Sequence, residues 1–227
     1  IKEVLEYCST LNFHEIVLIT NGLLITDDIL ETLKNNVDSL CVSLDGYNEE
    51  INKKVRGEGN FEKTVSKIKL LRENNIPVNI IATIYKENID DIKKYTEFAK
   101  LNCTISFSLF TKSGEALKNQ EMEQSKEQLE GLTKYLLEGD MDEIIFDNIP
   151  VVKGITYKEN CGAGEYLISV NADGNVYPCH FMMKSELCMG NLLNESIETI
   201  LSRGICHHNA MNVNNISECK DCDYKYL

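Results

Sequence analysis

The chain has 227 residues, which suits one domain or one and a half and is long enough to bury a hydrophobic core. Its formal net charge is -13 and its lysines and arginines are scattered, so we expect no nucleic-acid surface and a basic or neutral polypeptide as the natural partner. The apolar runs have the length of strands and the N-terminus carries no secretion signal, which predicts a cytoplasmic protein without a membrane span.

Strand and helix signals alternate through the first part of the chain. Residues 1–7 read as the middle of a helix without a cap, which indicates that the sequence continues a longer chain. Four short runs then have the near-continuous apolar character of strands covered on both faces: 16–19, 40–44, 78–84 and 105–109. This character is typical of a parallel sheet.

Helices are predicted between and after these strands. Thr26 can cap one helix, Asn60 can cap a second, and a third is expected over 89–100. Ser125 and Gln128 form a capping box ahead of a fourth, for which a glycine at position 139 offers a stop. Repeated strand and helix units are what a (β/α) barrel or a doubly wound sheet requires, and four strands are too few to close a barrel.

Residues 151–227 differ in character, because six of the nine cysteines of the chain lie there. A hairpin is predicted from 168 to 177 with Gly174 at a positive φ, and a short helix from 196 to 202. So small a region cannot fold on hydrophobic burial alone. We therefore expect metal ligation to supply part of its stability.

The spacing of the cysteines predicts a metal site. Twelve residues separate Cys161 from Gly174, four separate Gly174 from Cys179, and Cys219 and Cys222 form a Cys-x-x-Cys pair. In a protein that is not secreted, such usage points to metal or cluster ligation before disulfides. These thiolates can converge on one metal or on two clusters, and thiolate sulfur suits iron–sulfur clusters and zinc alike.

The same run of cysteines resembles the signature of the SPASM domain, which in that family carries two auxiliary [4Fe–4S] clusters. The resemblance implies that Cys161, Cys179, Cys219 and Cys222 are cluster ligands. It also implies that residues 151–227 form a SPASM-type domain.

The first half resembles a radical SAM barrel, in which loops at the strand ends hold S-adenosylmethionine (SAM). Segments 19–22 and 42–46 carry this resemblance, with Arg56 downstream. It implies an α/β fold, a partial (β/α) TIM-type barrel over residues 1–150. Ser43 would contact the methionine or ribose of SAM, Arg56 would meet its carboxylate, and Asn21 would shape the floor of the pocket.

The family's reducing cluster is held by a Cys-x-x-x-Cys-x-x-Cys loop, and by resemblance that loop would lie before Ile1, so we expect the chain alone to be inactive. Sulfatase-maturing relatives carry an aspartate where this sequence has His180, which favours a thioether or related crosslink in a ribosomally made peptide. His180 is a candidate proton acceptor, although a histidine beside a metal cysteine is as often a hydrogen-bond donor to sulfur.

Two other functions stay open: a zinc-stabilised module that binds a peptide without catalysis, and a degenerate scaffold that only mediates assembly. Among the remaining cysteines, Cys8, Cys41 and Cys103 fit small buried residues, whereas Cys188 and Cys206 fit either free thiols or ligands. An unprotected sheet edge at 16–19 predicts a dimer or an exchange of elements.

Overall fold

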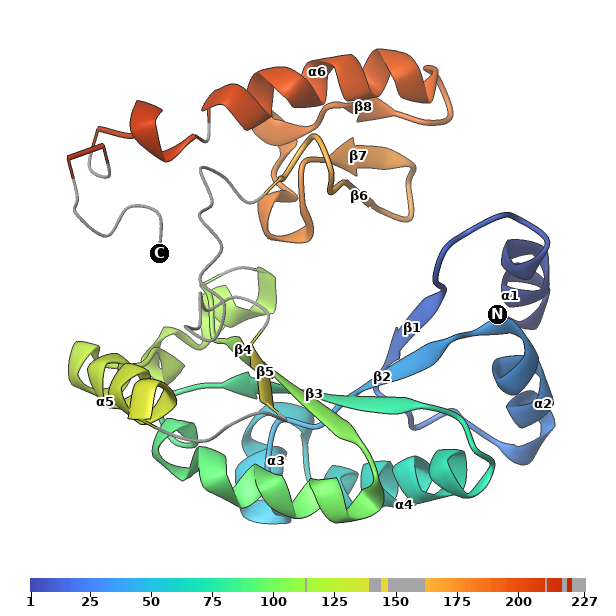
Figure 1. Cartoon of the computed structure of the whole chain (residues 1–227), viewed down its shortest axis with the longest axis vertical. Helices are drawn as coiled ribbons and strands as arrows, with labels where there is room; N and C mark the ends of the chain where they lie inside the picture. The colour runs from blue at the N-terminus through green and yellow to red at the C-terminus, as the bar shows by residue number, and fades with distance from the viewer. Residues whose placement is uncertain (113, 139–143, 147–161, 211, 218–219, 222–227) are drawn as a thin grey trace. The chain divides into compact units, whose positions relative to one another are not determined.

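The computed structural model describes residues 1–112, 114–138, 144–146, 162–210, 212–217 and 220–221 (Figure 1). The chain splits into two compact units, Ile1–Val152 and Lys153–Leu227. Of the calls made from the sequence, Gly139, Cys161, Cys219 and Cys222 lie outside the described residues.

The first unit alternates helices and strands, as the sequence predicts. Its elements are α1 (Lys2–Ser9), β1 (Val17–Thr20), α2 (Asp27–Asn36), β2 (Ser39–Ser43), α3 (Glu49–Arg56), α4 (Asn60–Glu73), β3 (Val78–Ile84), the 3₁₀ segment η1 (Ile89–Leu101), β4 (Thr104–Leu109), the 3₁₀ turns η2 (Gly114–Lys118) and η3 (Gln120–Met122), α5 (Lys126–Glu138) and β5 (Ile144–Phe146).

The five strands form one parallel sheet in the order β1-β2-β3-β4-β5. Consecutive strands are neighbours and helical segments connect them, so the chain winds in one direction, and α3 and α4 lie along one face of the sheet (Figure 1). This confirms the predicted α/β fold. The three-residue strand β5 was not predicted.

The core of this unit lies between the sheet and its helices. Along β3, Val78, Ile80, Ala82 and Ile84 are buried, and they pack in one cluster with apolar side chains of α2 and α4. The alternate residues of β2 and β3 face the other way and are half-buried. Both faces of these strands are thus covered at least in part, the second one less completely because it carries polar residues as well as apolar ones.

Asn79 links polar groups across three strands on this second face. Its side-chain amide donates to the hydroxyl of Ser106 at 3.0 Å and to the sulfur of Cys41 at 3.7 Å, and its carbonyl accepts from the hydroxyl of Thr104 at 3.0 Å. Because each polar group finds a partner, a polar residue is tolerated near the start of a central strand.

The capping residues predicted from the sequence agree only in part with those that the structure shows. Ser125 and Gln128 exchange hydrogen bonds at 3.2 Å in both directions, which confirms the capping box. Asn60 does not cap α4, whose first turn instead donates from the N–H groups of Gly59 and Phe61 to the carboxylate of Glu49. A carboxylate suits this place because helix N-termini attract negative charge.

The second unit is a three-stranded antiparallel sheet covered by a helix. Its elements are β6 (Ser169–Val170), β7 (Asn175–Tyr177), the 3₁₀ turns η4 (His180–Met182) and η5 (Ser185–Leu187), β8 (Gly190–Asn191), α6 (Ile197–Ala210) and the 3₁₀ turn η6 (Val213–Asn215). The hairpin is confirmed, with Gly174 at φ +81. The helix expected over 196–202 continues to Ala210.

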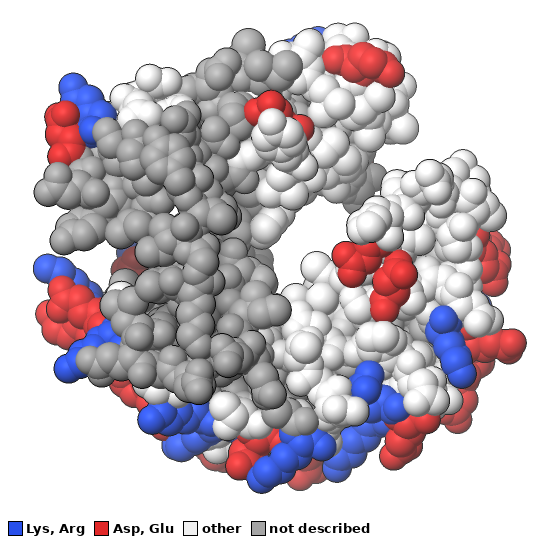
Figure 2. All heavy atoms as spheres, in the orientation of Figure 1, with Lys and Arg blue, Asp and Glu red and all other residues white. Residues whose placement is uncertain are grey.

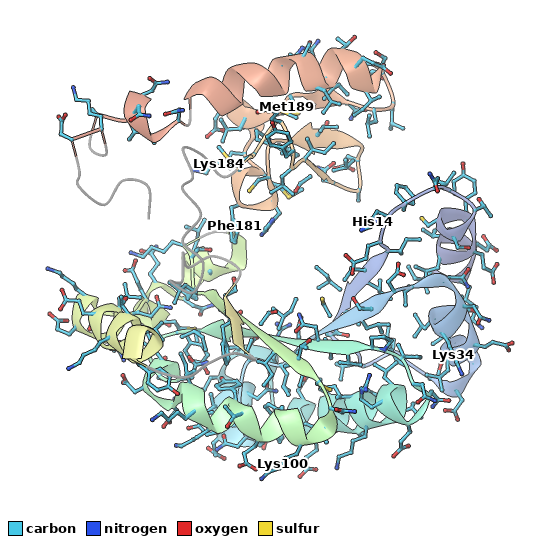
Figure 3. All side chains as sticks on the ribbon, viewed as in Figure 1. His14, Lys34, Lys100, Phe181, Lys184 and Met189 are labelled. Carbon is cyan, nitrogen blue, oxygen red and sulfur yellow. The ribbon has the colours of Figure 1, made fainter. Side chains whose placement is uncertain are left out.

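The core of the second unit is small. Among the described residues it consists of Val176, Met189 and Ile200 with Ile168 packed against them, and Met189 lies between α6 and the sheet (Figure 3). Gly204 in α6 meets the backbone of Gly164 so closely that a Cβ on Gly204 would lie 2.0 Å from the carbonyl oxygen of Gly164. The helix therefore docks through backbone contact as well as through side chains.

Two wider expectations concern membranes and surface charge. Within the part of the chain that the structure describes, no helix has both the length and the apolar character that a membrane span needs. On the face that Figure 2 presents, basic and acidic side chains are mixed over the surface of the first unit.

Candidate cofactor and metal sites

Asp45 organises the carboxyl end of β2. Its side chain is 1% exposed, and its Oδ1 accepts a hydrogen bond of 2.7 Å from the backbone N–H of Thr83 on β3. Its Oδ2 accepts one of 2.5 Å from Nε of Arg56, which lies at the end of α3. The carboxylate therefore joins two neighbouring strand ends to a helix, and the pairing with a cation makes burial of the charge tolerable.

The backbone of Asp45 is fixed as firmly as its side chain. Its carbonyl oxygen accepts from the hydroxyl of Tyr95 at 2.7 Å and from the amide of Asn88 at 3.1 Å. Asn88 also donates to the carbonyl of Thr83 and accepts from the N–H of Tyr85. This network holds the loop after β2 against the loop after β3.

Burial and charge shape the titration of tyrosines near this loop. Burial in an apolar surrounding raises the pKa of Tyr95 above its ordinary value of 10.0. Tyr47 donates to the carboxylate of Asp91 at 2.6 Å, which raises the pKa of Tyr47. The pKa of Asp91 is lowered, first by its bond with Lys94 and then by the bond from Tyr47.

Ser43 and Asn21 lie at the same edge of the sheet. Thr20 is paired in register with Val42, so the residue after each, Asn21 and Ser43, stands at neighbouring strand ends. The side-chain oxygen of Asn21 accepts from the N–H of Leu23 at 3.2 Å. Among the described residues, the hydroxyl of Ser43 forms no hydrogen bond.

Arg56 reaches this edge through Asp45. Its side chain is 30% exposed, and within the described part of the chain only its Nε is engaged, by the Asp45 carboxylate. Both terminal nitrogens of the guanidinium are thus available as paired donors. A carboxylate is the group that such a planar fork recognises.

These three residues fit the methionine end of SAM. Within the described part of the chain, the edge offers the Ser43 hydroxyl and the terminal guanidinium nitrogens of Arg56 without hydrogen-bond partners, and these are the donors that a carboxylate needs. Gly22, at φ +77, turns the chain after Asn21 where a Cβ would contact Val42 at 3.3 Å. The sequence brought forward Asn21, Ser43 and Arg56, whereas Asp45 was included only as a member of the segment 42–46 and was given no role of its own.

Cys179 is the one described residue of the four proposed cluster ligands. It is 8% exposed, and its sulfur accepts a hydrogen bond of 3.3 Å from the backbone N–H of Phe181 at the start of η4. An N–H aimed at sulfur stabilises the anionic thiolate that metals and clusters require. The donor chemistry at Cys179 therefore fits a cluster or a zinc ion.

The described residues by themselves form no group of three or more metal-ligating side chains. The other three proposed ligands, Cys161, Cys219 and Cys222, fall outside the described residues, so their convergence with Cys179 stays a prediction. His180 follows Cys179 and is exposed, and its ring lies 4.0 Å from that of Phe181 between ring centroids.

The remaining cysteines have varied surroundings. Cys103 is buried, and burial raises the pKa of its thiol. Cys8 and Cys41 are only half-buried, so the expectation of full burial was right for Cys103 alone. Cys188 is half-buried and its thiol donates to the carbonyl of Gly190 at 3.5 Å. Cys206 lies in α6.

Comparisons with known proteins agree with the family resemblances predicted for both halves of the chain. Two family models match the chain: the Radical SAM superfamily over residues 1–99 and SPASM, the iron–sulfur cluster-binding domain, over residues 161–223. The chain is 27% identical over 211 residues to the antilisterial bacteriocin subtilosin biosynthesis protein AlbA of Bacillus subtilis. The aligned region covers 91% of this chain and 46% of that protein.

Two further relatives extend this result. An AdoMet-dependent heme synthase of Methanosarcina barkeri is 39% identical over 97 residues, or 42% of this chain and 28% of that protein. Streptococcus suis SuiB, solved with its precursor peptide SuiA, has a similar fold with a TM-score of 0.69 at 14% identity, over 88% of this chain and 50% of that one.

This chain spans half or less of the length of each of these three proteins. Both family models nevertheless match it, one in each unit, at the strand ends and at the cysteines that carry the candidate sites. Residues 1–99 therefore match the radical SAM superfamily, and residues 161–223 match the iron–sulfur cluster-binding domain of the SPASM type.

Proposed function

We propose that these residues belong to an enzyme that modifies a ribosomally made peptide, through a thioether or related crosslink. The observation that carries this proposal is the pairing on one chain of a strand-end site built for a carboxylate with a cysteine-rich unit whose Cys179 sulfur is buried under an N–H donor. The proteins similar to this chain include AlbA, a bacteriocin biosynthesis protein, and SuiB, solved with a precursor peptide.

The first unit would hold SAM at the edge formed by the ends of β1 and β2. Arg56 would bind the carboxylate of the methionine part, Ser43 would donate to the same part or to the ribose, and Asn21 would form the floor. When bound and cleaved, SAM supplies a 5′-deoxyadenosyl radical that abstracts hydrogen from the peptide. The chain's own task here is to bind and orient.

The second unit would hold auxiliary [4Fe–4S] clusters through Cys161, Cys179, Cys219 and Cys222. Its small core supports this, because the apolar cluster that the described residues form, three buried side chains with one packed against them, gives little hydrophobic stabilisation for a folded unit. His180 is exposed beside Cys179 and would accept a proton from the peptide. Zinc can occupy the same thiolates when iron is withheld.

We further infer a cytoplasmic location and self-association through β1. Val17 and Ile19 are 42% and 67% exposed, and β1 is an edge of the described sheet. An exposed apolar edge strand invites pairing with another strand. Sedimentation at rising protein concentration tests this, and a monomer throughout would contradict it.

The proposed activity is tested with the longest reading frame that contains this sequence, purified and reconstituted without oxygen. The protein is incubated with SAM, a reductant and a candidate precursor peptide encoded beside it, and the peptide is analysed by mass spectrometry. A loss of two hydrogen masses per crosslink, with formation of 5′-deoxyadenosine, is the expected result. An unmodified peptide together with intact SAM would favour the zinc-stabilised binding module.

A further inference from the structure

The buried ion pair between Asp45 and Arg56 has a second consequence beyond neutralising a charge. Arginine side chains have many rotamers. A guanidinium that must recognise a carboxylate in one geometry therefore binds it more tightly when its orientation is fixed before the ligand arrives. Asp45 engages Nε, and the two terminal nitrogens then lie side by side with no hydrogen-bond partner among the residues that the structure describes. An ion pair through a terminal nitrogen would have used half of that fork.

We propose that Asp45 is a positioning residue, which orients the Arg56 guanidinium so that its free edge recognises the carboxylate of SAM. The inference rests on the proposed function, because it presupposes that the strand-end edge binds SAM. The proposal gives a role in SAM binding to Asp45, a residue that does not itself contact SAM.

Asp45, with which Arg56 pairs, is itself held rigidly. Asp45 is held at three places: its carboxylate by the N–H of Thr83, its carbonyl by the hydroxyl of Tyr95, and the same carbonyl by the amide of Asn88. These bonds come from β3, η1 and the loop between them rather than from α3, so the position of the carboxylate does not depend on Arg56.

The helix that carries Arg56 is fixed against the same loop. Asn52 lies one turn before Arg56 on α3, and its side-chain oxygen accepts from the N–H of Gly46 at 3.2 Å. Tyr85 donates to the carbonyl of Ile51 at 2.9 Å from the end of β3. Both ends of the ion pair are therefore set by contacts outside it, which is what orienting a side chain requires.

A purely structural role for the pair makes a different prediction, and two variants separate the two roles. Asp45→Asn keeps an oxygen for the Thr83 N–H but presents an NH₂ group to Nε of Arg56, so the orientation is lost while the strand tie remains. Tyr95→Phe is the matched control, because it removes one bond to the carbonyl of Asp45 and one from Asn88, while the Asn88 bond to that carbonyl and the carboxylate bonds to Thr83 and Arg56 remain.

The measurement is the affinity of the reconstituted full-length protein for SAM and for decarboxylated SAM, by equilibrium binding under anaerobic conditions. The affinity for SAM divided by the affinity for decarboxylated SAM isolates recognition of the carboxylate. We expect Asp45→Asn to reduce that ratio about tenfold or more, as losing an oriented charge-assisted bond does. Arg56→Gln should reduce it by a similar factor, and the double variant by no more than either.

Each other outcome has a defined meaning. If Asp45→Asn weakens both ligands equally, or Tyr95→Phe changes the ratio as much, the pair is structural and the positioning role is overturned. If Asp45→Asn leaves the ratio unchanged while Arg56→Gln reduces it, Arg56 needs no orienting partner and the role is overturned as well. If the unaltered protein binds neither ligand, the proposed function itself falls, and this inference falls with it.

Discussion

The backbone of Gly46 lies directly against Asn52 on helix α3. Its N–H donates to the side-chain oxygen of Asn52, and a Cβ built on Gly46 would lie 2.2 Å from the backbone nitrogen of Asn52. Only a residue without a side chain fits there. The loop after β2 and the helix that presents Arg56 thus share one backbone contact.

Replacing Gly46 with alanine should therefore destabilise the first unit. The methyl group meets backbone rather than a flexible side chain, so either α3 or the loop must move, at a cost of about 2–3 kcal/mol in the free energy of unfolding. Urea denaturation measures this. Gly131→Ala on α5 is the control: it meets no atom within 4 Å and should stabilise by about 0.5–1 kcal/mol. Equal stability of the two variants would contradict the contact.

Local signals in the sequence were sufficient for the strands and some turns. The predicted run 78–84 is β3, residue for residue, because five of its seven residues are apolar and a proline and a polar loop limit it. The hairpin at Gly174 and the capping box of Ser125 and Gln128 were also predictable, since each depends on residues a few positions apart.

What the sequence did not reveal depends on distant partners. The importance of Asp45 comes from Thr83, 38 residues away, and Arg56, 11 residues away, so the Asp-Gly pair alone indicated only a turn. Helix α3 was not predicted, although Asn48 caps it with a bond from the N–H of Ile51. Its charged sequence has few apolar residues, and its position is fixed by contacts with Asp45 and Gly46.

The second unit makes its own prediction at Gly204. A Cβ there would lie 2.0 Å from the carbonyl oxygen of Gly164, so Gly204→Ala should lift α6 from the small sheet and lower stability by about 2–3 kcal/mol. Ser202→Ala on the exposed side of the same helix should change stability by less than about 0.5 kcal/mol. Thermal unfolding followed by circular dichroism compares the two, and similar melting temperatures would refute the backbone docking.

Stability should fall at alkaline pH because of Tyr95. Burial raises the pKa of its phenol, so the neutral form is favoured in the fold, and its contribution is complete below the ordinary value of 10.0. As the pH rises beyond that value, the unfolded chain releases the proton first, and stability is lost at about 1.4 kcal/mol per pH unit.

Urea denaturation at about pH 8 and about pH 11 tests this slope, with tyrosinate absorbance to follow ionisation. Tyr95→Phe should be less stable at the lower pH, because it loses the bond to the Asp45 carbonyl, but its stability should fall less between the two values. A variant with the same slope as the unaltered protein would show that another group is responsible.

Cys179 and Cys188 should differ in their effect on bound metal. The Cys179 sulfur accepts a hydrogen bond from a backbone N–H, which leaves its lone pairs directed by a donor, whereas the Cys188 thiol is engaged as a donor to the carbonyl of Gly190. We expect Cys179→Ala to lower the iron and sulfide content of the reconstituted protein and Cys188→Ala to leave it unchanged. The reverse pattern would assign the ligand to Cys188.

The proposed function depends on the binding of iron by cysteine thiolates of the second unit. The most direct measurement is the iron, sulfide and zinc content of the protein after anaerobic reconstitution, together with its absorption spectrum. We predict a brown protein with iron and sulfide in equal amounts, near four of each per occupied site. Stoichiometric zinc that iron cannot displace, or cysteines that stay free of any metal, would contradict it.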